Sequence, residues 1–333
     1  MTTFIIAEAG INHNANYDIA LKLIDNAKLC GANAIKFQTA IPEEVMIKSA
    51  KQSPYQSKNF KSSSQLEMAK KLHFDHEIFI DLNKYCNRRN IEFISSPFDT
   101  LSMDYLLKKI KPKKMKIPSG EILNVPLLRK LKGYKGDVII STGMSTINDI
   151  NFCMNVLQDI GINKKRISIL HCHTDYPTKS SDANILAIKH IEKIFKTRVG
   201  YSDHTLGINA SIIAVALGAT IIEKHFTIDK SLPGPDQSSS LNISEFRTMV
   251  EAIRDVESLI GSGIKKPTKS ELLNEAQVKK SIVAAKDINK GERLTIKNIT
   301  TKRPMGGVSS KEWDSIIDSK SKYNYKKDDF IKK

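Results

Sequence analysis

The stretch VGYSDHTLGINASIIAVALGATIIEKHFTIDKSLPGPD, residues 199–236, decides the fold class of this chain. An apolar run ends in YSDH at 201–204, and a helical pattern follows over 210–217. A second apolar run then ends in EKH at 223–225. Short apolar runs on either side of a helical segment predict a strand, a helix and a second strand parallel to the first.

Each of these two predicted strands ends in a histidine. Neighbouring parallel strands place their carboxyl ends at the same edge of a sheet, so His204 and His225 are expected side by side, with Asp236 on the loop just beyond. Two neutral imidazoles near carboxylates suit a divalent transition metal. The alternative is a pair of hydrogen-bonded histidines at strand ends, but the pairing across one strand–helix–strand unit favours a metal.

Composition indicates a globular protein without membrane segments. The chain has 333 residues, 40% of them hydrophobic and 26% charged, which is enough for a large core and two domains. No apolar run is long enough to cross a bilayer, and MTTFIIAEAG enters a strand pattern with no basic region before an apolar signal core. We therefore expect a cytoplasmic protein with no membrane partner.

The net charge of +16 raises the question of a nucleic-acid partner. The lysines are dispersed, aromatic residues make up only 7%, and no RNP-like motif, zinc finger or helix-turn-helix pattern occurs. Most of the charge is therefore interpreted as solvated surface, with no nucleic acid bound. A basic C-terminal domain that binds nucleic acid beside a vestigial barrel is the alternative, and it would bind with a steep salt dependence.

Strand-like apolar runs recur along the chain, and most end in polar residues. Helical patterns separate them at 19–30, 76–89, 102–109, 125–131, 147–160 and 185–195. About eight such repeats over roughly 260 residues predict an α/β fold, a (β/α)8 TIM barrel, whose functional groups gather at the carboxyl ends of the strands. An open doubly wound sheet is the alternative, but the turn GINHN lacks the G-x-G-x-x-G dinucleotide pattern.

The rest of the chain adds one insertion and a small second domain. The polar segment 41–71 follows the second strand, so we expect it to lie over the barrel mouth as a lid or interface. We expect the barrel at 1–264, a linker at 265–277 that includes the start of a helix capped by Ser270, and a β-rich domain at 278–333.

The predicted strand ends carry two kinds of chemistry. Lysines and hydroxyls suit a phosphate and a carboxylate: Lys36, Lys116, Ser119, Ser141, Thr142 and Ser202. Carboxylates beside the histidines suit a metal and proton transfer: Glu8, Glu121, Asp203 and Asp236. Together they suggest carbon–carbon bond chemistry on a phosphorylated small molecule.

Motifs through almost the whole chain carry a family resemblance. They are AEAGINHN at 7–14, IKFQT at 35–39, SPFD at 96–99, KIPSGE at 116–121, STGM at 141–144, HCxxxYPT at 171–178, GYSDHT at 200–205, EKHFT at 223–227, GPD at 234–236 and TKRP at 301–304. In this order they resemble the sialic acid synthase family, which includes N-acetylneuraminate, legionaminate and pseudaminate synthases. The C-terminal part resembles that family's SAF domain, which is similar to type III antifreeze proteins.

The resemblance implies a metal-dependent condensation of phosphoenolpyruvate with an open-chain N-acetylated mannose-type sugar. It implies that His204 and His225 hold Mn²⁺ or Mg²⁺, and that Glu8 handles the water or a proton. It places phosphoenolpyruvate against Lys36, Lys116, Ser119, Ser141 and Ser202, and it places Ser96 as a substrate contact near the sugar or the phosphate. It places the sugar hydroxyls against Gln38, Glu121, Tyr176 and Asp236.

The resemblance also implies a domain-swapped homodimer, in which Arg303 of one protomer recognises the N-acetyl group at the other protomer's site. Departures from the family pattern at Ser96, at Thr174 and in the turn Met305-Gly306-Gly307 leave the sugar open. An N,N'-diacetyllegionaminate synthase that uses the 6-deoxy-diacetamido sugar is the first alternative. A metal-dependent sugar-phosphate aldolase or epimerase is the more distant one.

Overall fold

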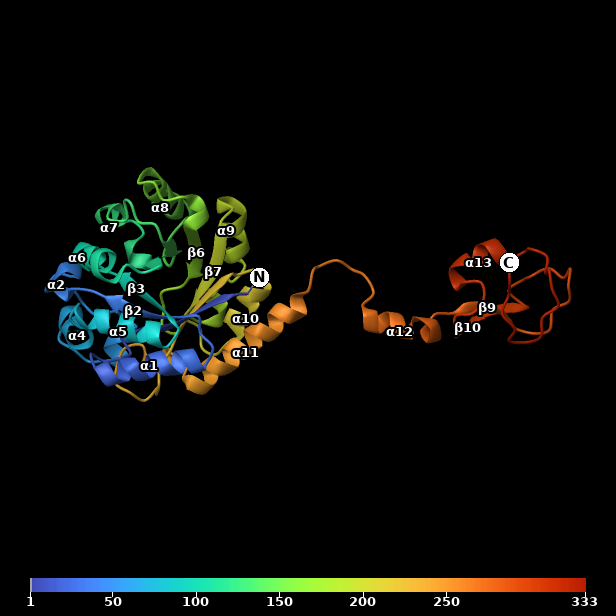
Figure 1. The fold of residues 1–333 in the computed structure, drawn as a ribbon, viewed down its shortest axis with the longest axis horizontal. Helices are drawn as coiled ribbons and strands as arrows, with labels where there is room; N and C mark the ends of the chain where they lie inside the picture. Colours follow the sequence, from blue (N-terminus) through green and yellow to red (C-terminus); the bar gives the residue numbers. More distant parts are fainter. Residues whose placement is uncertain (1) are drawn as a thin grey trace. The chain divides into compact units, whose positions relative to one another are not determined.

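The computed structural model describes residues 2–333. The chain divides after Gly261 into two compact units, and each is a fold of its own. Strands and helices alternate through the first unit, as the sequence pattern predicts (Figure 1). Among the described residues, no helix combines the length and the apolar character that crossing a membrane requires.

Eight parallel strands form the centre of the first unit. They pair in the order β3-β2-β1-β8-β7-β6-β5-β4. Strands β3 and β4 at the two ends of this order contact each other, and Lys114 Nζ lies 2.8 Å from Glu92 Oε2 across the join. The strands are β1 (Phe4–Gly10), β2 (Ala34–Thr39), β3 (Glu92–Pro97), β4 (Lys114–Ile117), β5 (Asp137–Ser141), β6 (Ile167–Cys172), β7 (Arg198–Asp203) and β8 (Ile221–His225).

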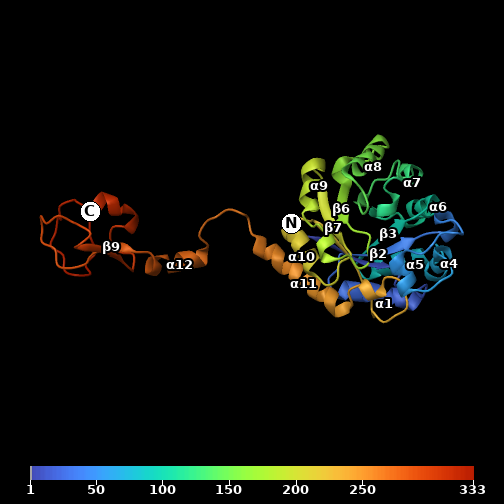
Figure 2. The same ribbon diagram turned by 180° about the vertical axis from the view of Figure 1, so that it is seen from behind.

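Helices surround this ring of strands, as Figures 1 and 2 show from opposite sides. The fold is the predicted barrel, and the open doubly wound sheet is excluded. The helices are α1 (Tyr17–Leu29), α5 (Ile78–Arg88), α6 (Thr100–Tyr105), α7 (Val125–Arg129), α8 (Ile147–Asp159), α9 (Ala187–Phe195), α10 (Asn209–Ala216) and α11 (Ile243–Ile260). The predicted helix at 102–109 is divided between α6 and a π-helical turn, Leu106–Ile110.

A layer of apolar side chains fills the inside of the barrel. It consists of Ile6, Ala34, Ile94, Ile139, Leu170 and Ile221, one each from six of the strands. On β7 the corresponding position in this layer is Gly200. A Cβ atom there would lie 2.4 Å from the Ile221 carbonyl oxygen, so only glycine fits. Because side chains alternate along a strand, the residue two positions further on each strand also points inward, toward the carboxyl end.

The segment 41–71 folds over the carboxyl ends of the strands as three short helices, α2 (Pro42–Val45), α3 (Pro54–Asn59) and α4 (Gln65–Leu72). Met68 and Leu72 pack with Ile11 of the first strand-to-helix turn. Asn59 Nδ2 donates to the Pro235 carbonyl oxygen at 2.8 Å. The insertion therefore lies at the barrel mouth, as expected, and forms part of its wall.

The second unit begins with helix α12 (Lys269–Val278). Its N-cap is Thr268, whose hydroxyl accepts from the Glu271 backbone N–H while Glu271 bonds back to Thr268, so the expected cap at Ser270 is wrong. A capping box needs its acidic partner three residues on, and only Thr268 has one. Strands β9 (Ser281–Ala284) and β10 (Ile299–Lys302) pair antiparallel, and the short helix α13 (Trp313–Ile316) follows.

Candidate active site

Each strand of the barrel contributes at least one side chain to a cavity of about 170 Å³ at the carboxyl ends. On six strands this side chain stands two residues after the apolar layer, which is why it points inward. The eight residues, in strand order, are Glu8, Lys36, Ser96, Lys116, Ser141, Cys172, Ser202 and Glu223. The loops and strand ends above them add Gln38, Ser119, Tyr176, His204 and His225.

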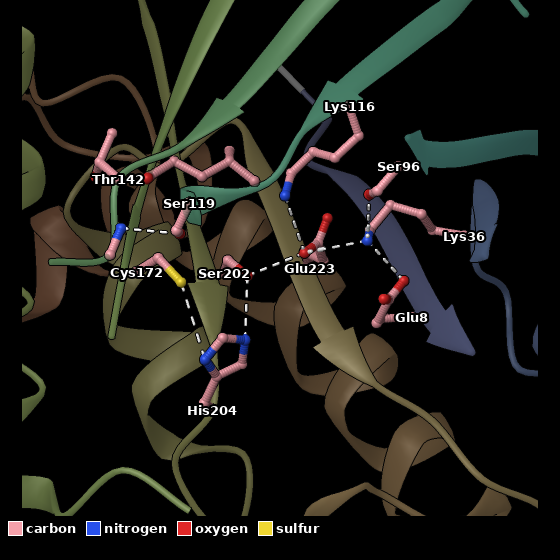
Figure 3. A network of polar contacts seen from close by, with 12 residues as sticks. Glu8, Lys36, Ser96, Lys116, Ser119, Thr142, Cys172, Ser202, His204 and Glu223 are labelled. Carbon is pink, nitrogen blue, oxygen red and sulfur yellow. Dashed lines mark hydrogen bonds and ion pairs between the residues drawn. The ribbon is translucent and has the colours of Figure 1, made fainter. Parts of the chain in front are cut away.

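The charged side chains of this cavity form one network (Figure 3). Lys36 Nζ lies 2.9 Å from Glu8 Oε2 and 3.8 Å from Glu223 Oε1. Lys116 Nζ lies 3.4 Å from the same Glu223 oxygen, which also accepts the Ser202 hydroxyl at 3.0 Å. Glu223 therefore holds two ammonium groups and a hydroxyl together, in the arrangement that an anion with several oxygens requires.

Burial and charge set the protonation of this network in different directions. Burial by itself would lower the pKa of Lys36, but Glu223 and Glu8 outweigh it and the pKa is raised. Burial by itself would raise the pKa of Glu223, but Lys116 and Lys36 outweigh it and the pKa is lowered. Burial raises the pKa of Glu8 in spite of Lys36. Glu8 therefore accepts a proton more readily than an exposed glutamate does.

Three hydroxyls surround the lysines. Ser96 Oγ accepts from Lys36 Nζ at 3.0 Å, so the serine at this position supplies a polar contact. Ser119 Oγ accepts from the Gly143 backbone N–H at 2.9 Å. Ser141 Oγ is buried and has no hydrogen-bond partner among the described residues. A buried hydroxyl without a partner beside two ammonium groups suits a ligand oxygen.

The two histidines meet, as predicted, at the ends of β7 and β8. The ring centroids of His204 and His225 lie 5.4 Å apart, and the Tyr176 ring stacks on His204 at 4.0 Å. His204 Nδ1 contacts the carbonyl oxygen of His173. Because a carbonyl only accepts, Nδ1 carries the hydrogen, and in the neutral ring Nε2 then presents its lone pair. Burial by itself would lower the pKa of His204, but Cys172 and the His173 carbonyl outweigh it and the pKa is raised, so a cation at Nε2 would have to displace a proton.

A divalent cation fits these donors. Burial, with His204 and Lys36 nearby, holds the pKa of His225 well below its usual range, so its ring is neutral, and the buried Nδ1 has no partner among the described residues. Residues 2–333 contain no group of three or more His, Cys, Asp or Glu side chains placed as metal ligands. The protein would therefore supply two imidazoles and leave the other positions to water or substrate.

A second cavity, of about 230 Å³, adjoins the first and shares Gln38 and Tyr176 with it. Asp236 lines this second cavity. Burial raises the pKa of its carboxyl to about 7, and Glu8 adds to the rise while His204 opposes it. The predicted sugar contacts Gln38, Tyr176 and Asp236 thus lie together, beside the histidines.

Comparison with known sequences agrees with this geometry. The sequence profile of the NeuB family matches residues 23–265, and that of the SAF domain matches residues 279–333. The chain belongs to the NeuB family. Several of its relatives are named as synthases of nonulosonic acids, and this NeuB protein is an enzyme of that class.

Three relatives of this NeuB protein span most of its length. The N,N'-diacetyllegionaminic acid synthase of Campylobacter jejuni is 43% identical over 99% of both chains. That of Legionella pneumophila is 40% identical over 97% of this chain and 92% of its own. The crystal structure of N-acetylneuraminic acid (sialic acid) synthetase from Leptospira borgpetersenii has a TM-score of 0.71 and 32% identity, over 82% of this chain and 90% of its own.

Several predicted rim residues lie elsewhere in this NeuB protein. Glu121 lines neither cavity, and its carboxylate accepts from Asn124 Nδ2 at 2.6 Å. Asp203 points away from the site and pairs with Lys224 Nζ at 2.9 Å, and the Thr142 hydroxyl donates to a backbone carbonyl of β6. Arg303 belongs to the second unit, so its expected role stays a prediction.

The sequence argument missed Glu223 as a site residue. It stands two positions before His225 on β8, so strand alternation places both side chains on the same face. This spacing of two residues could have identified Glu223 from the sequence. Asp203 stands directly before His204, so the same alternation places its side chain on the opposite face.

Proposed function

We propose that this NeuB-family enzyme condenses phosphoenolpyruvate with an open-chain N-acetylated mannose-type sugar, giving a nonulosonic acid and phosphate. One observation carries the proposal: two lysines with hydroxyls around them share a cavity with two imidazoles. The first group suits a small phosphorylated acid, and the second suits a cation at an aldehyde oxygen. A reaction that joins a small phosphorylated acid to a sugar aldehyde uses both groups of residues.

Phosphoenolpyruvate would lie between β2 and β7. Lys36 and Lys116 face its negative charges, and hydroxyls complete the cradle: Ser96, Ser119, Ser141 and Ser202. These donors sit on short strands inside a packed barrel, so they need little reorganisation when the ligand binds. Their main task is to aim the methylene carbon of phosphoenolpyruvate at the sugar.

His204 and His225 would hold Mn²⁺ or Mg²⁺, and the cation supplies Lewis-acid polarisation of the sugar aldehyde. Gln38, Tyr176 and Asp236 orient the sugar hydroxyls from the second cavity. Glu121 and Arg303 are the further sugar contacts that the family resemblance implies.

The bonds balance without a further reactant. The π electrons of the phosphoenolpyruvate C=C bond form the new C–C bond from its methylene carbon to the aldehyde carbon, and the aldehyde oxygen takes up a proton to become a hydroxyl. Water adds its oxygen to the phosphate-bearing carbon, and the C–O bond to phosphate then breaks as that carbon becomes a ketone. One proton of the water replaces the proton taken by the aldehyde oxygen, and the other leaves with the phosphate. Glu8 takes the proton from this water, as its raised pKa and its place beside Lys36 suit a proton acceptor in the interior.

Release of phosphate tests the proposal. Purified protein with Mn²⁺ should release phosphate from phosphoenolpyruvate only when an amino sugar is present. N-Acetylmannosamine and its 6-deoxy-diacetamido analogue are the two sugars to supply. Absence of phosphate with both would refute the proposal, and turnover of a sugar phosphate without phosphoenolpyruvate would favour an aldolase or epimerase.

The diacetamido sugar is the second candidate substrate. The observation in its favour is the 43% and 40% identity to two N,N'-diacetyllegionaminic acid synthases. We further propose that the enzyme works in the cytoplasm as a domain-swapped homodimer, with no nucleic acid or membrane as a partner.

A further inference from the structure

The insertion 41–71 forms much of the barrel mouth although it is built from short helices. It supplies more than half of the residues that line the second cavity. None of its helices, α2, α3 and α4, is longer than eight residues. Helices this short do not hold their place by themselves. Contacts from outside the insertion must therefore fix where it begins and where it ends.

The carboxylate of Asp99 contacts the first residue of the insertion. Asp99 is buried and follows Phe98 in the turn between β3 and α6. Its Oδ1 accepts the Ser102 backbone N–H at 2.7 Å and so caps helix α6. Its Oδ2 accepts the backbone N–H of Ile41, where the insertion begins, at 2.9 Å. The two oxygens therefore have separate tasks, and only the first belongs to the helix cap.

The same Oδ2 atom is connected to the far end of the insertion through Ser102. It accepts the Ser102 hydroxyl at 2.5 Å. Because the proton of that hydroxyl points to the carboxylate, the hydroxyl oxygen accepts from His76 Nε2 at 3.0 Å. His76 lies in the turn between α4, the last helix of the insertion, and α5. Asp99 is thus bonded to the chain both where it enters the insertion and where it returns to the barrel.

The helix cap by itself does not require these further contacts. A serine or an asparagine caps a helix with a single oxygen. The second oxygen of Asp99 joins segments at 41, 76 and 99–102, which are far apart in the chain. Hydrogen bonds to a carboxylate are about twice as strong as those between neutral groups. This carboxylate is therefore suited to hold the insertion in place.

We infer that Asp99 is a positioning residue that holds both ends of the insertion and so fixes the wall of the second cavity at the barrel mouth. Asp99 lines neither cavity, so it acts through the insertion and through Phe98, which lines both cavities. Its effect on sugar binding rests on the proposed function. Its effect on the insertion does not, and the two can be measured separately.

Hydrogen–deuterium exchange, followed by mass spectrometry, tests the hold on the insertion without turnover. Asp99→Asn keeps the shape and one acceptor oxygen for the cap of α6, but its amide nitrogen cannot accept from Ile41. Peptides from 41–71 should exchange at least about 10-fold faster than in the wild type, and those from α6 should not change. Asp99→Ser, which can also cap a helix, is the second variant if Asp99→Asn fails to fold.

Asp149→Asn is the matched control. Asp149 is also a carboxylate at the start of a barrel helix, where it accepts the Thr146 backbone N–H at 2.8 Å in the capping box of α8. Among residues 2–333, its carboxylate accepts hydrogen bonds from Thr146 alone. Exchange in the insertion should therefore match that of the wild type.

The phosphate-release assay connects the insertion to the site. Asp99→Asn should raise the KM for the sugar about 10-fold, because the wall that orients the sugar is held less firmly. The KM for phosphoenolpyruvate should rise less, because Lys36 and Lys116 stand on β2 and β4. Asp149→Asn should leave both KM values as in the wild type.

Three results would overturn the inference. Unchanged exchange of the insertion in Asp99→Asn would show that the carboxylate does not hold it. Equally faster exchange in α6 would show that Asp99 is a helix cap alone, and an equal rise in both KM values would contradict a role in positioning the sugar. A wild-type protein without activity on either sugar would refute the proposed function, whereas the exchange comparison would still decide whether Asp99 holds the insertion.

Discussion

Single side chains in the catalytic cavity balance one another's charge. Lys36 and Lys116 face Glu8 and Glu223, so these four groups carry no net charge when all are ionised. Glu223 makes the closest contact to Lys116, which keeps that ammonium group paired in the interior. An anionic substrate therefore needs a compensating positive charge, which a divalent cation beside His225 would supply.

His225→Ala should weaken Mn²⁺ binding at least about 10-fold and abolish most activity, because one of two imidazole donors is lost. Calorimetric titration of metal-free protein with Mn²⁺ measures this directly, without turnover. His190→Ala, an exposed histidine on α9, is the control and should bind Mn²⁺ like the wild type. Unchanged affinity in His225→Ala would refute the assignment of this ring as a ligand.

Asp236 should make the protein less stable as the pH rises. Its pKa is about 7 in the folded chain against an ordinary value of 3.8, so the folded state binds the proton more tightly. The free energy of unfolding therefore falls as the pH rises from 3.8 to about 7, and it stays low above that range. The total loss is about 4 kcal/mol at most. Urea unfolding of metal-free wild type and Asp236→Asn at about pH 5 and about pH 8 measures the effect.

The asparagine variant carries no titrating group at this position. It should be the more stable protein at the higher pH and should lose the sugar contact of the carboxylate. If the wild type and Asp236→Asn showed the same change in stability with pH, the carboxyl would not be the group responsible.

Strands β7 and β8 are joined behind the histidines by a buried ion pair. Lys224 Nζ lies 2.9 Å from Asp203 Oδ2, and both side chains are at most 1% exposed. Asp203 also accepts from the Thr205 backbone N–H and from the Ser211 hydroxyl. The pair holds the strand ends from which His204 and His225 project, so it is a structural element of the site.

Lys224→Met should destabilise the protein by about 3–5 kcal/mol, because Asp203 would be left as a buried charge without its partner. The double variant Asp203→Asn/Lys224→Met should be less destabilised than the sum of the two single variants. Chemical unfolding of all four proteins measures the coupling. Removing the exposed pair Lys189–Glu192 is the control and should cost about 1 kcal/mol or less.

Elements differ in how far sequence patterns predict them. The long amphipathic patterns at 147–160 and 19–30 became α8 and α1, because three or more turns carry a clear apolar stripe. The helices in segment 41–71 have four to eight residues and were not predicted. Helices this short depend on caps and on tertiary packing, such as that of Met68 against Ile11.

At the scale of the whole molecule, the second unit has its own apolar core, which includes Ile282, Ile299 and Ile331. The chain divides into two compact units after Gly261. The predicted end of the barrel at 264 and the predicted start of the SAF domain at 278 stay predictions. A domain-swapped homodimer would bring Arg303 of one protomer to the sugar site of the other.

Mixing two impaired variants, at a sugar concentration well below the KM of Arg303→Ala, tests this arrangement. Arg303→Ala should raise the KM for the sugar more than that for phosphoenolpyruvate, and His225→Ala should lose metal chemistry. In a mixed dimer, one site combines an intact barrel with an intact Arg303. With random exchange, half the dimers are mixed and one site of two works in each, so about a quarter of wild-type activity should return.

Each variant measured alone at the same total concentration is the control. Mass spectrometry should confirm that mixed dimers have formed. If activity does not return in these mixed dimers, Arg303 either acts at the site of its own protomer or does not act at the site.

The sequence by itself determined the barrel and the type of chemistry at its mouth. Polar residues at the ends of the predicted strands pointed to Lys36, Lys116, Ser202, His204 and His225, which all line the cavity, because a parallel barrel brings every strand end to one rim. The tertiary structure added Glu223 to the predicted site and removed Asp203 from it. Glu223 points inward and Asp203 outward, since the register of each strand sets the face on which a residue lies. The lining of the second cavity likewise combines segments far apart in the chain, which only packing brings together.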